Sequence, residues 1–131
     1  MSSHFDCHSY LGKDVALDSQ ALTGATAGVI VDTKDFESLD LVMQTSVVTG
    51  DSVFKLEHGE DIALADATDV LPADLIDDQN LTILAADGAS QIKSVGYRGK
   101  KRYVRLAFVS GTATASGMFI KGDPKEVPVA N

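Results

Sequence analysis

The sequence predicts an all-β protein, an antiparallel β-sandwich of jelly-roll-like form with little helix. Apolar and polar residues alternate with period two along most of the chain, as expected of strands that bury one face. The apolar segments are short, and turn-forming residues such as glycine separate them at intervals of about 8–12 residues. No segment sustains the period of an amphipathic helix. Short strands punctuated in this way are typical of sandwiches and jelly rolls.

Three strands are expected in the first half of the chain. Val-Ile-Val at 29–31 provides an early strand, and the alternation over 39–48 predicts a longer one. Thr-Gly-Asp at 49–51 is typical of a turn. The segment 52–58 is therefore expected to return as the second strand of a hairpin.

The second half repeats this pattern. A short strand is expected at 81–84, and Asp-Gly at 87–88 is a turn signal. Alternation resumes over 102–109, Gly111 interrupts it, and the segment 112–121 is expected to return as its partner. The residues predicted to form the core are Leu39, Leu41, Met43, Phe54, Leu56, Val104, Leu106, Phe108 and Ile120.

Length and composition indicate a single globular domain. The chain has 131 residues, of which 44% are hydrophobic and 23% charged. No apolar run approaches the roughly 20 residues that cross a bilayer, and the N-terminus lacks a secretory pattern, so no membrane association is expected. The single cysteine, Cys7, excludes an intramolecular disulfide and fits a reducing compartment. We expect residues 1–28 to form an N-terminal arm and first connection, and residues 29–131 to form the sandwich domain.

Charge is distributed unevenly along the chain. The net charge is −8, but residues 1–90 carry 17 acidic and 3 basic side chains, whereas residues 91–131 carry 2 acidic and 8 basic ones. Such asymmetry within one domain indicates a surface that meets a partner. The excess of acidic residues argues against nucleic acid as that partner, because phosphate binding requires clustered cations with little opposing charge.

The N-terminus contains potential metal ligands. His4, Cys7 and His8 lie within five residues of one another, and zinc accepts all three. A structural zinc site needs a fourth ligand at matched spacing, and the remaining histidine, His58, lies inside a predicted strand. The pattern therefore predicts a polar arm, with no metal site and no cofactor.

Two further motifs contain residue types that can carry chemistry. Gly-Asp-Ser-Val at 50–53 resembles an esterase nucleophile block, but Ser52 lies in an expected turn and has no recognisable base or oxyanion pocket. The carboxylates of the stretch 63–78 and its flank do not match an EF-hand, and Pro72 interrupts any helix there. This stretch is expected to be a solvated acidic loop with about one helical turn. The acidic residues concerned are Asp61, Asp66, Asp69, Asp74, Asp77 and Asp78. We expect no catalytic residue, and so no enzyme.

The segment 96–105 contains the densest cluster of cations. Two tyrosines accompany them, a combination that could track a nucleic-acid backbone. However, alternation with Val104 and Leu106 is also typical of the solvent face of a strand, and a basic edge docks on acidic protein surfaces. We favour a protein partner. The cations expected to make this contact are Arg98, Lys100, Lys101, Arg102 and Arg105.

The same segment carries a family resemblance. Val-Gly-Tyr-Arg-Gly-Lys-Lys-Arg-Tyr-Val-Arg-Leu at 95–106 resembles a segment of small virion proteins of tailed bacteriophages and prophages. In that family a glycine–aromatic turn, a basic pair and Tyr-Val-Arg lead into a Thr/Gly-rich strand. Gly-Asp-Pro at 122–124 and Pro-Val at 128–129 resemble the family's C-terminal end. The resemblance extends over roughly residues 29–129.

The resemblance implies a structural protein of the phage head, encoded near the major capsid protein. Its implied role is capsid decoration, or cementing, on the outside of the major capsid shell. The implied partners are the major capsid protein and neighbouring copies of the chain itself. The implied location is the virion, after synthesis in the cytoplasm of the bacterial host. The family supplies no catalytic residues.

The N-terminal arm is a second expected contact with the partner. Residues 1–14 are too polar and too short to pack as a core element alone, so we expect them to order on a partner. Their apolar anchors would be Phe5, Tyr10 and Leu11.

Two other binding roles remain open at the level of sequence. A head–tail joining or neck protein of the same virion would form a ring at one vertex. A carbohydrate-binding sandwich module for host attachment would need aromatic platforms, and the chain has no Trp and three Tyr.

Overall fold

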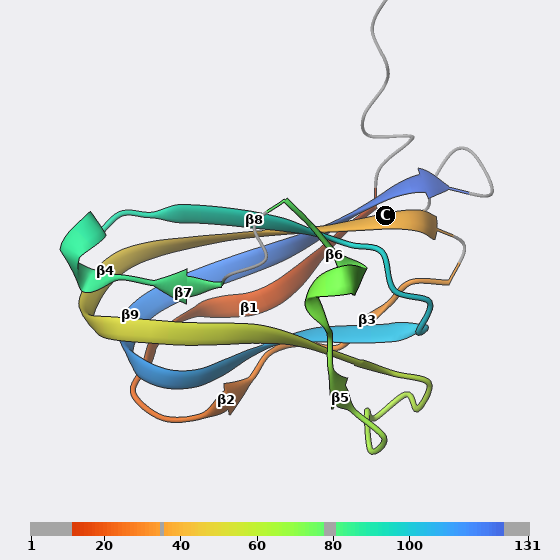
Figure 1. The fold of residues 1–131 in the computed structure, drawn as a ribbon, viewed down its shortest axis with the longest axis horizontal. Helices are drawn as coiled ribbons and strands as arrows, with labels where there is room; N and C mark the ends of the chain where they lie inside the picture. The colour runs from red at the N-terminus through yellow and green to blue at the C-terminus, as the bar shows by residue number, and fades with distance from the viewer. Residues whose placement is uncertain (1–11, 35, 78–80, 125–131) are drawn as a thin grey trace, which may run out of the picture.

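The computed structural model describes residues 12–34, 36–77 and 81–124 as a single antiparallel sheet with two short 3-10 helices (Figure 1). The all-β class is thus confirmed. The strands are β1 (Gly12–Leu22), β2 (Thr26–Ala27), β3 (Val31–Asp32), β4 (Phe36–Gly59), β5 (Thr68–Asp69), β6 (Leu75–Asp77), β7 (Thr82–Ile83), β8 (Ile92–Tyr97) and β9 (Tyr103–Pro124). The 3-10 helices are η1 (Pro72–Asp74) and η2 (Ala85–Asp87). Among the described residues, no helix is long and apolar enough to span a membrane.

Two long strands form the centre of the sheet. β4 has 24 residues and β9 has 22, and they pair antiparallel from Phe36 opposite Pro124 to Gly59 opposite Tyr103. Figure 1 shows both strands curving together at one end of the molecule and running back. The main strand order is β1-β9-β4-β8-β6, while β2 and β3 pair with β9, and β5 and β7 pair with β4.

The two predicted hairpins are wrong. The residues at 49–51 and Gly111 lie opposite one another inside the β4–β9 ladder, where the register shifts repeatedly between Thr45 and Phe54. Gly111 has φ +119°, a conformation that favours glycine. A bulge accentuates strand bending, so these residues bend a continuous two-stranded ribbon instead of reversing each strand. The result is one open sheet, not the two separate sheets of the predicted sandwich.

Both halves of the ribbon contribute to one hydrophobic cluster. Eight of the nine predicted core residues belong to it. Ile120 is the exception: it is partly exposed, and its neighbour Phe119 is fully buried. Phe119 pairs with buried Leu41, whereas Ile120 pairs with exposed Asp40 and so lies on the opposite face of the sheet.

The sequence pattern did not reveal the first strand. Residues 12–22, assigned to the arm and first connection, form β1 and pair with the second half of β9. Register shifts on both sides of Leu17 mark bulges, and consecutive Ala16 and Leu17 are both buried. Strict alternation is lost at a bulge, which explains why period two did not identify this strand.

The segment 63–78, predicted to be a loop with about one helical turn, contains the helical turn η1 but also the short strands β5 and β6, which the prediction did not include. η1 begins at Pro72, whose missing N–H is not needed at the start of a helix. β6 follows and pairs with β8, placing Leu75 opposite Tyr97. The strand predicted at 81–84 corresponds to β7, and only Val31 of the strand predicted at 29–31 lies in β3.

Candidate functional site

The structure divides the five predicted contact cations into two groups. Arg105 lies on β9 opposite Glu57 on β4, and its Nε is 2.8 Å from a carboxylate oxygen of Glu57. Arg102 donates two hydrogen bonds to the carboxylate of Asp32, at 2.9 and 2.8 Å. Its guanidinium also lies 5.0 Å from the ring centre of Tyr103. These two arginines join neighbouring strands within the molecule, so the prediction that they contact a partner stays untested.

The other three cations form an exposed surface between β8 and β9. Arg98, Lys100 and Lys101 are exposed on the connection 98–101, which we call the basic loop. Ion pairs within the sheet account for Arg102 and Arg105, so the basic loop is the part of the predicted edge that is available to an acidic partner.

Backbone contacts hold the basic loop in place. The N–H of Arg98 donates to the carbonyl of Asp74 at 2.7 Å, and the N–H of Lys101 donates to the Tyr97 hydroxyl at 3.2 Å. At the loop's end, the carbonyl of Arg102 accepts a hydrogen bond from the N–H of Thr33 at 2.8 Å. The loop is therefore attached to η1, to β8 and to the residue after β3.

Gly99 lets the loop cross the face of Tyr97. A Cβ at position 99 would lie 2.5 Å from Cζ of the Tyr97 ring and against its hydroxyl. Any larger residue would push the loop off the phenol ring. The glycine two residues after Tyr97 thus has a steric cause.

A buried histidine lies beneath the basic loop. His58 continues the inward-facing alternation of Phe54 and Leu56 on β4, and only 8% of its surface is exposed. Its Nδ1 is 2.7 Å from the Tyr97 hydroxyl, and the two rings meet edge to face with centres 5.6 Å apart. Burial lowers the pKa of His58 and raises the pKa of Tyr97 to about 12.

The acidic residues next to this site mainly shape turns. The carboxylate of Asp66 accepts the N–H groups of Glu60 at 2.9 Å and Asp61 at 3.1 Å, and these bonds lower the pKa of Asp66. The carboxylate of Asp61 in turn accepts two backbone N–H groups, from Ala63 and Ala65. Such side-chain-to-backbone bonds are the usual reason for Asp in tight loops.

The remaining residues of the predicted acidic loop differ in their contacts. Asp69 forms an ion pair with Lys55 at 2.8 Å, and Asp74 contributes its carbonyl to the basic loop. The side chains of Asp77 and Asp78 lie outside the described part of the chain. Within the described residues, no group of three His, Cys, Asp or Glu side chains could hold a metal ion.

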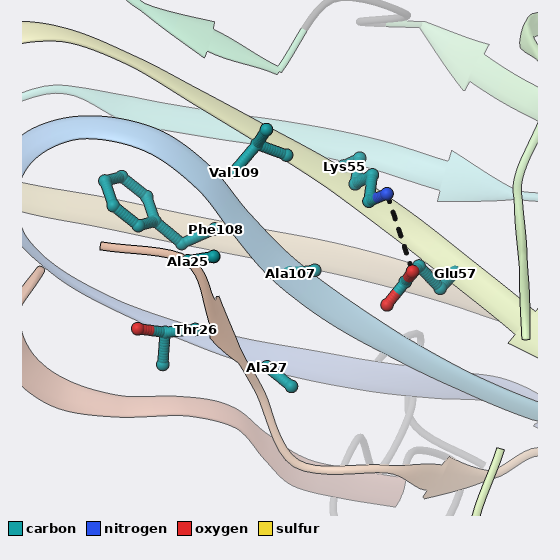
Figure 2. A pocket seen from close by; sticks show the side chains of 8 residues that line it. All are labelled: Ala25, Thr26, Ala27, Lys55, Glu57, Ala107, Phe108 and Val109. Atoms are coloured by element: carbon teal, nitrogen blue, oxygen red, sulfur yellow. Dashed lines mark ion pairs between the residues drawn. The ribbon is translucent and has the colours of Figure 1, made fainter. Parts of the chain in front are cut away.

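A surface hollow of about 280 Å³ lies between β2, β4 and β9 (Figure 2). Alanines and Thr26 line it together with Phe108 and Val109, and Lys55 and Glu57 lie at one side as an ion pair of 3.5 Å. Both charges have further partners, Asp69 for Lys55 and Arg105 for Glu57. The charged side chains beside the hollow therefore neutralise one another, and none of the residues that line it is placed to react.

The other candidate residues are either buried or outside the described part of the chain. Ser52 is fully buried within β4, and its hydroxyl donates to the carbonyl of Gly50 at 2.9 Å. The arm residues Phe5, Tyr10 and Leu11, and the potential ligands His4, Cys7 and His8, lie outside the described residues.

Sequence reasoning missed the residues that support the loop. The local pattern identifies Tyr97 only as one aromatic of the basic segment and His58 only as a residue of a strand. The alternation of Phe54, Leu56 and His58 was a usable signal, because it places the histidine on the buried face. Its contact with Tyr97 joins residues 39 positions apart, and no local pattern indicates that contact.

Known proteins resemble this chain in structure and not detectably in sequence. No protein-family model matches the sequence, and no curated protein sequence matches it. The fold is similar to the crystal structure of SPBc2 prophage-derived protein YomS, with a TM-score of 0.47 and 14% sequence identity. The match covers 84% of this chain and 94% of that chain. The chain is thus similar in structure, at low sequence identity, to a prophage-derived protein.

Proposed function

We propose that this chain is a structural protein of a tailed-phage head, a capsid decoration protein that binds the outside of the major capsid shell. The family resemblance of residues 95–106 supports the virion role. The structural observation that supports it is the basic loop: three exposed cations on a chain of net charge −8, fixed by backbone contacts and a glycine. The proposal places mature copies on the virion after synthesis in the host cytoplasm.

A fixed basic loop is well suited to docking. Complementary charge accelerates encounter and orients the two surfaces. A loop already held in its bound geometry loses less conformational entropy on binding than a mobile one does. Weak contacts repeated over a capsid lattice can then retain each copy through high effective concentration. The partner surface expected is an acidic patch on the major capsid protein or on a neighbouring copy of this chain.

Copy number separates decoration from a neck role. We expect gel densitometry of purified virions to give a copy number comparable to that of the major capsid protein, because a decoration protein covers the whole shell. A value equal to one ring at a single vertex would contradict decoration and support the neck protein. Absence of the chain from purified virions would contradict both roles.

Charge reversal tests the basic loop directly. Replacing Lys100 and Lys101 together by Glu should slow association with undecorated capsids by about tenfold or more at low salt. The difference should shrink as salt rises, because the Debye length falls to about 8 Å at physiological ionic strength. Time-resolved light scattering or co-sedimentation at several salt concentrations measures this.

A matched double variant controls for net charge. Lys13 on β1 is exposed, and Lys93 lies at the end of β8 away from the basic loop; reversing both to Glu changes the net charge equally but leaves the basic loop intact. Association of this control should stay within about twofold of the parent, because only the general field changes. Equal slowing of both double variants, or slowing of neither, would contradict docking through the basic loop.

A further inference from the structure

The hydroxyl of Tyr97 joins three parts of the molecule. It lies 2.7 Å from Nδ1 of His58 on β4, and it accepts the N–H of Lys101 in the basic loop at 3.2 Å. Tyr97 itself is the last residue of β8 and is 6% exposed. The loop's backbone is therefore linked to the buried imidazole through one hydroxyl group.

A hydrogen bond donated by the Tyr97 hydroxyl to Nδ1 of His58 requires a neutral imidazole. The Lys101 N–H can only donate, so the Tyr97 oxygen accepts there. The hydroxyl proton then needs an acceptor, and among the described contacts that acceptor is Nδ1 of His58. His58 is therefore neutral in this arrangement, with its proton on Nε2.

We propose that His58 is a pH-sensitive latch for the basic loop: neutral His58 holds the loop through the Tyr97 hydroxyl, and protonated His58 releases it. An imidazolium donates at both nitrogens, so Nδ1 can no longer accept the hydroxyl proton. The Tyr97 oxygen would then face two N–H donors while its own proton lacked a partner. Breaking the contact with Lys101 relieves this conflict, because the loop is the most exposed of the three parts.

The surroundings of His58 set the pH range of the latch. Burial disfavours the charged imidazole, and so does the nearby Lys101, whereas Asp74 and Glu60 favour it. Asp66, next to the backbone of Gly59, adds a further negative charge close by. Burial dominates and lowers the pKa of the folded state below the ordinary value of 6.5. The stabilising contribution of neutral His58 is fully present above pH 6.5 and is lost as the pH falls from 6.5 through the folded pKa.

Release of the latch changes the docking surface. Once its hydrogen bond to the Tyr97 hydroxyl is lost, Lys101 is no longer held to β8, whereas the N–H of Arg98 stays bonded to the carbonyl of Asp74. Lys100 and Lys101 would then sample many arrangements, and binding would have to order them. Release of the loop therefore predicts weaker capsid decoration in mildly acidic solution, a prediction that rests on the proposed function.

The latch can be tested on the free protein, without any capsid. We expect the Lys101 amide of the parent to lose about three- to tenfold of its hydrogen-exchange protection as the pH is lowered in steps from 7.5 through the folded pKa of His58, after correction for intrinsic exchange. That factor corresponds to one net hydrogen bond. In His58→Asn, whose amide oxygen occupies the position of Nδ1 and can accept the Tyr97 proton but does not titrate, protection should not change with pH. Tyr97→Phe should lower protection throughout this pH range.

Two outcomes would overturn the latch. One is an equal pH dependence in His58→Asn and the parent. The other is a ¹⁵N NMR spectrum of the parent at pH 7.5 that shows the His58 proton on Nδ1. This measurement does not depend on whether a variant folds. Failure of the proposed decoration role would give a different result. The Lys101 amide would then show the expected pH-dependent protection, but the protein would not bind capsids.

Discussion

Replacing Leu106 by alanine is expected to lower the free energy of unfolding by about 2–5 kcal/mol, as in other buried large-to-small changes. Leu106 is fully buried on β9 and pairs with buried Leu56 on β4. Its Cδ2 lies 3.4 Å from the position that a Cβ of Gly117 would occupy, so it packs against the other half of the same strand. A cavity here would loosen the contact between the two halves of the ribbon.

Leu71→Ala is the matched control for this substitution. Leu71 precedes η1 and is 65% exposed, so removing the same atoms should change the free energy of unfolding by less than about 0.5 kcal/mol. Urea denaturation followed by circular dichroism measures both variants. Equal, small effects would show that the assignment of the buried face of β9 is wrong.

Replacing Gly111 by alanine is expected to destabilise the fold by about 2–6 kcal/mol. Its φ of +119° costs a residue with a side chain about 1–3 kcal/mol. A Cβ there would also lie 2.5 Å from the carbonyl oxygen of Asp51 and from Cα of Ser52, and such overpacking costs about 1–3 kcal/mol. Both costs arise where β4 and β9 bend together, so this variant tests whether the fold depends on the bend.

Three other glycines separate the two causes. At Gly24 a Cβ would meet nothing within 4 Å, and at Gly88 it would meet nothing either but φ is +103°. At Gly28 a Cβ would clash with the carbonyl oxygens of Ala16 and Leu106 without a positive φ. Alanine should be near neutral at Gly24, intermediate at Gly88 and Gly28, and most destabilising at Gly111. Thermal unfolding of the four variants measures this order. Equal midpoint temperatures for Gly111→Ala and Gly24→Ala would contradict it.

The alternation of the sequence predicted the faces of the long strands well. Leu39, Leu41 and Met43 on β4, and Val104, Leu106 and Phe108 on β9, lie in the core as expected. Period two succeeds there because side chains of a strand point alternately to its two faces, whatever the strand pairs with. The same rule put Ile120 on the wrong face, because the register shifts where the ribbon bends.

The docking surface was predicted only as a cluster of cations. The sequence placed five of them together, and the structure leaves three on the basic loop and engages two in ion pairs. Asp32 lies 70 residues from Arg102, and Glu57 lies 48 residues from Arg105. Charge composition indicates a contact surface, but long-range pairing selects which cations remain available.

Local sequence thus specified an all-β chain, the buried faces of its long strands and the concentration of cations at 98–105. Long-range pairing specified that the glycine-containing segments at 49–51 and 111 bend one ribbon, that residues 12–22 form an edge strand, and that His58 meets Tyr97. The division has a physical reason. Alternation and turn propensity are properties of neighbouring residues, whereas a bend and a hairpin use the same residues and differ only in which distant strand accepts their hydrogen bonds.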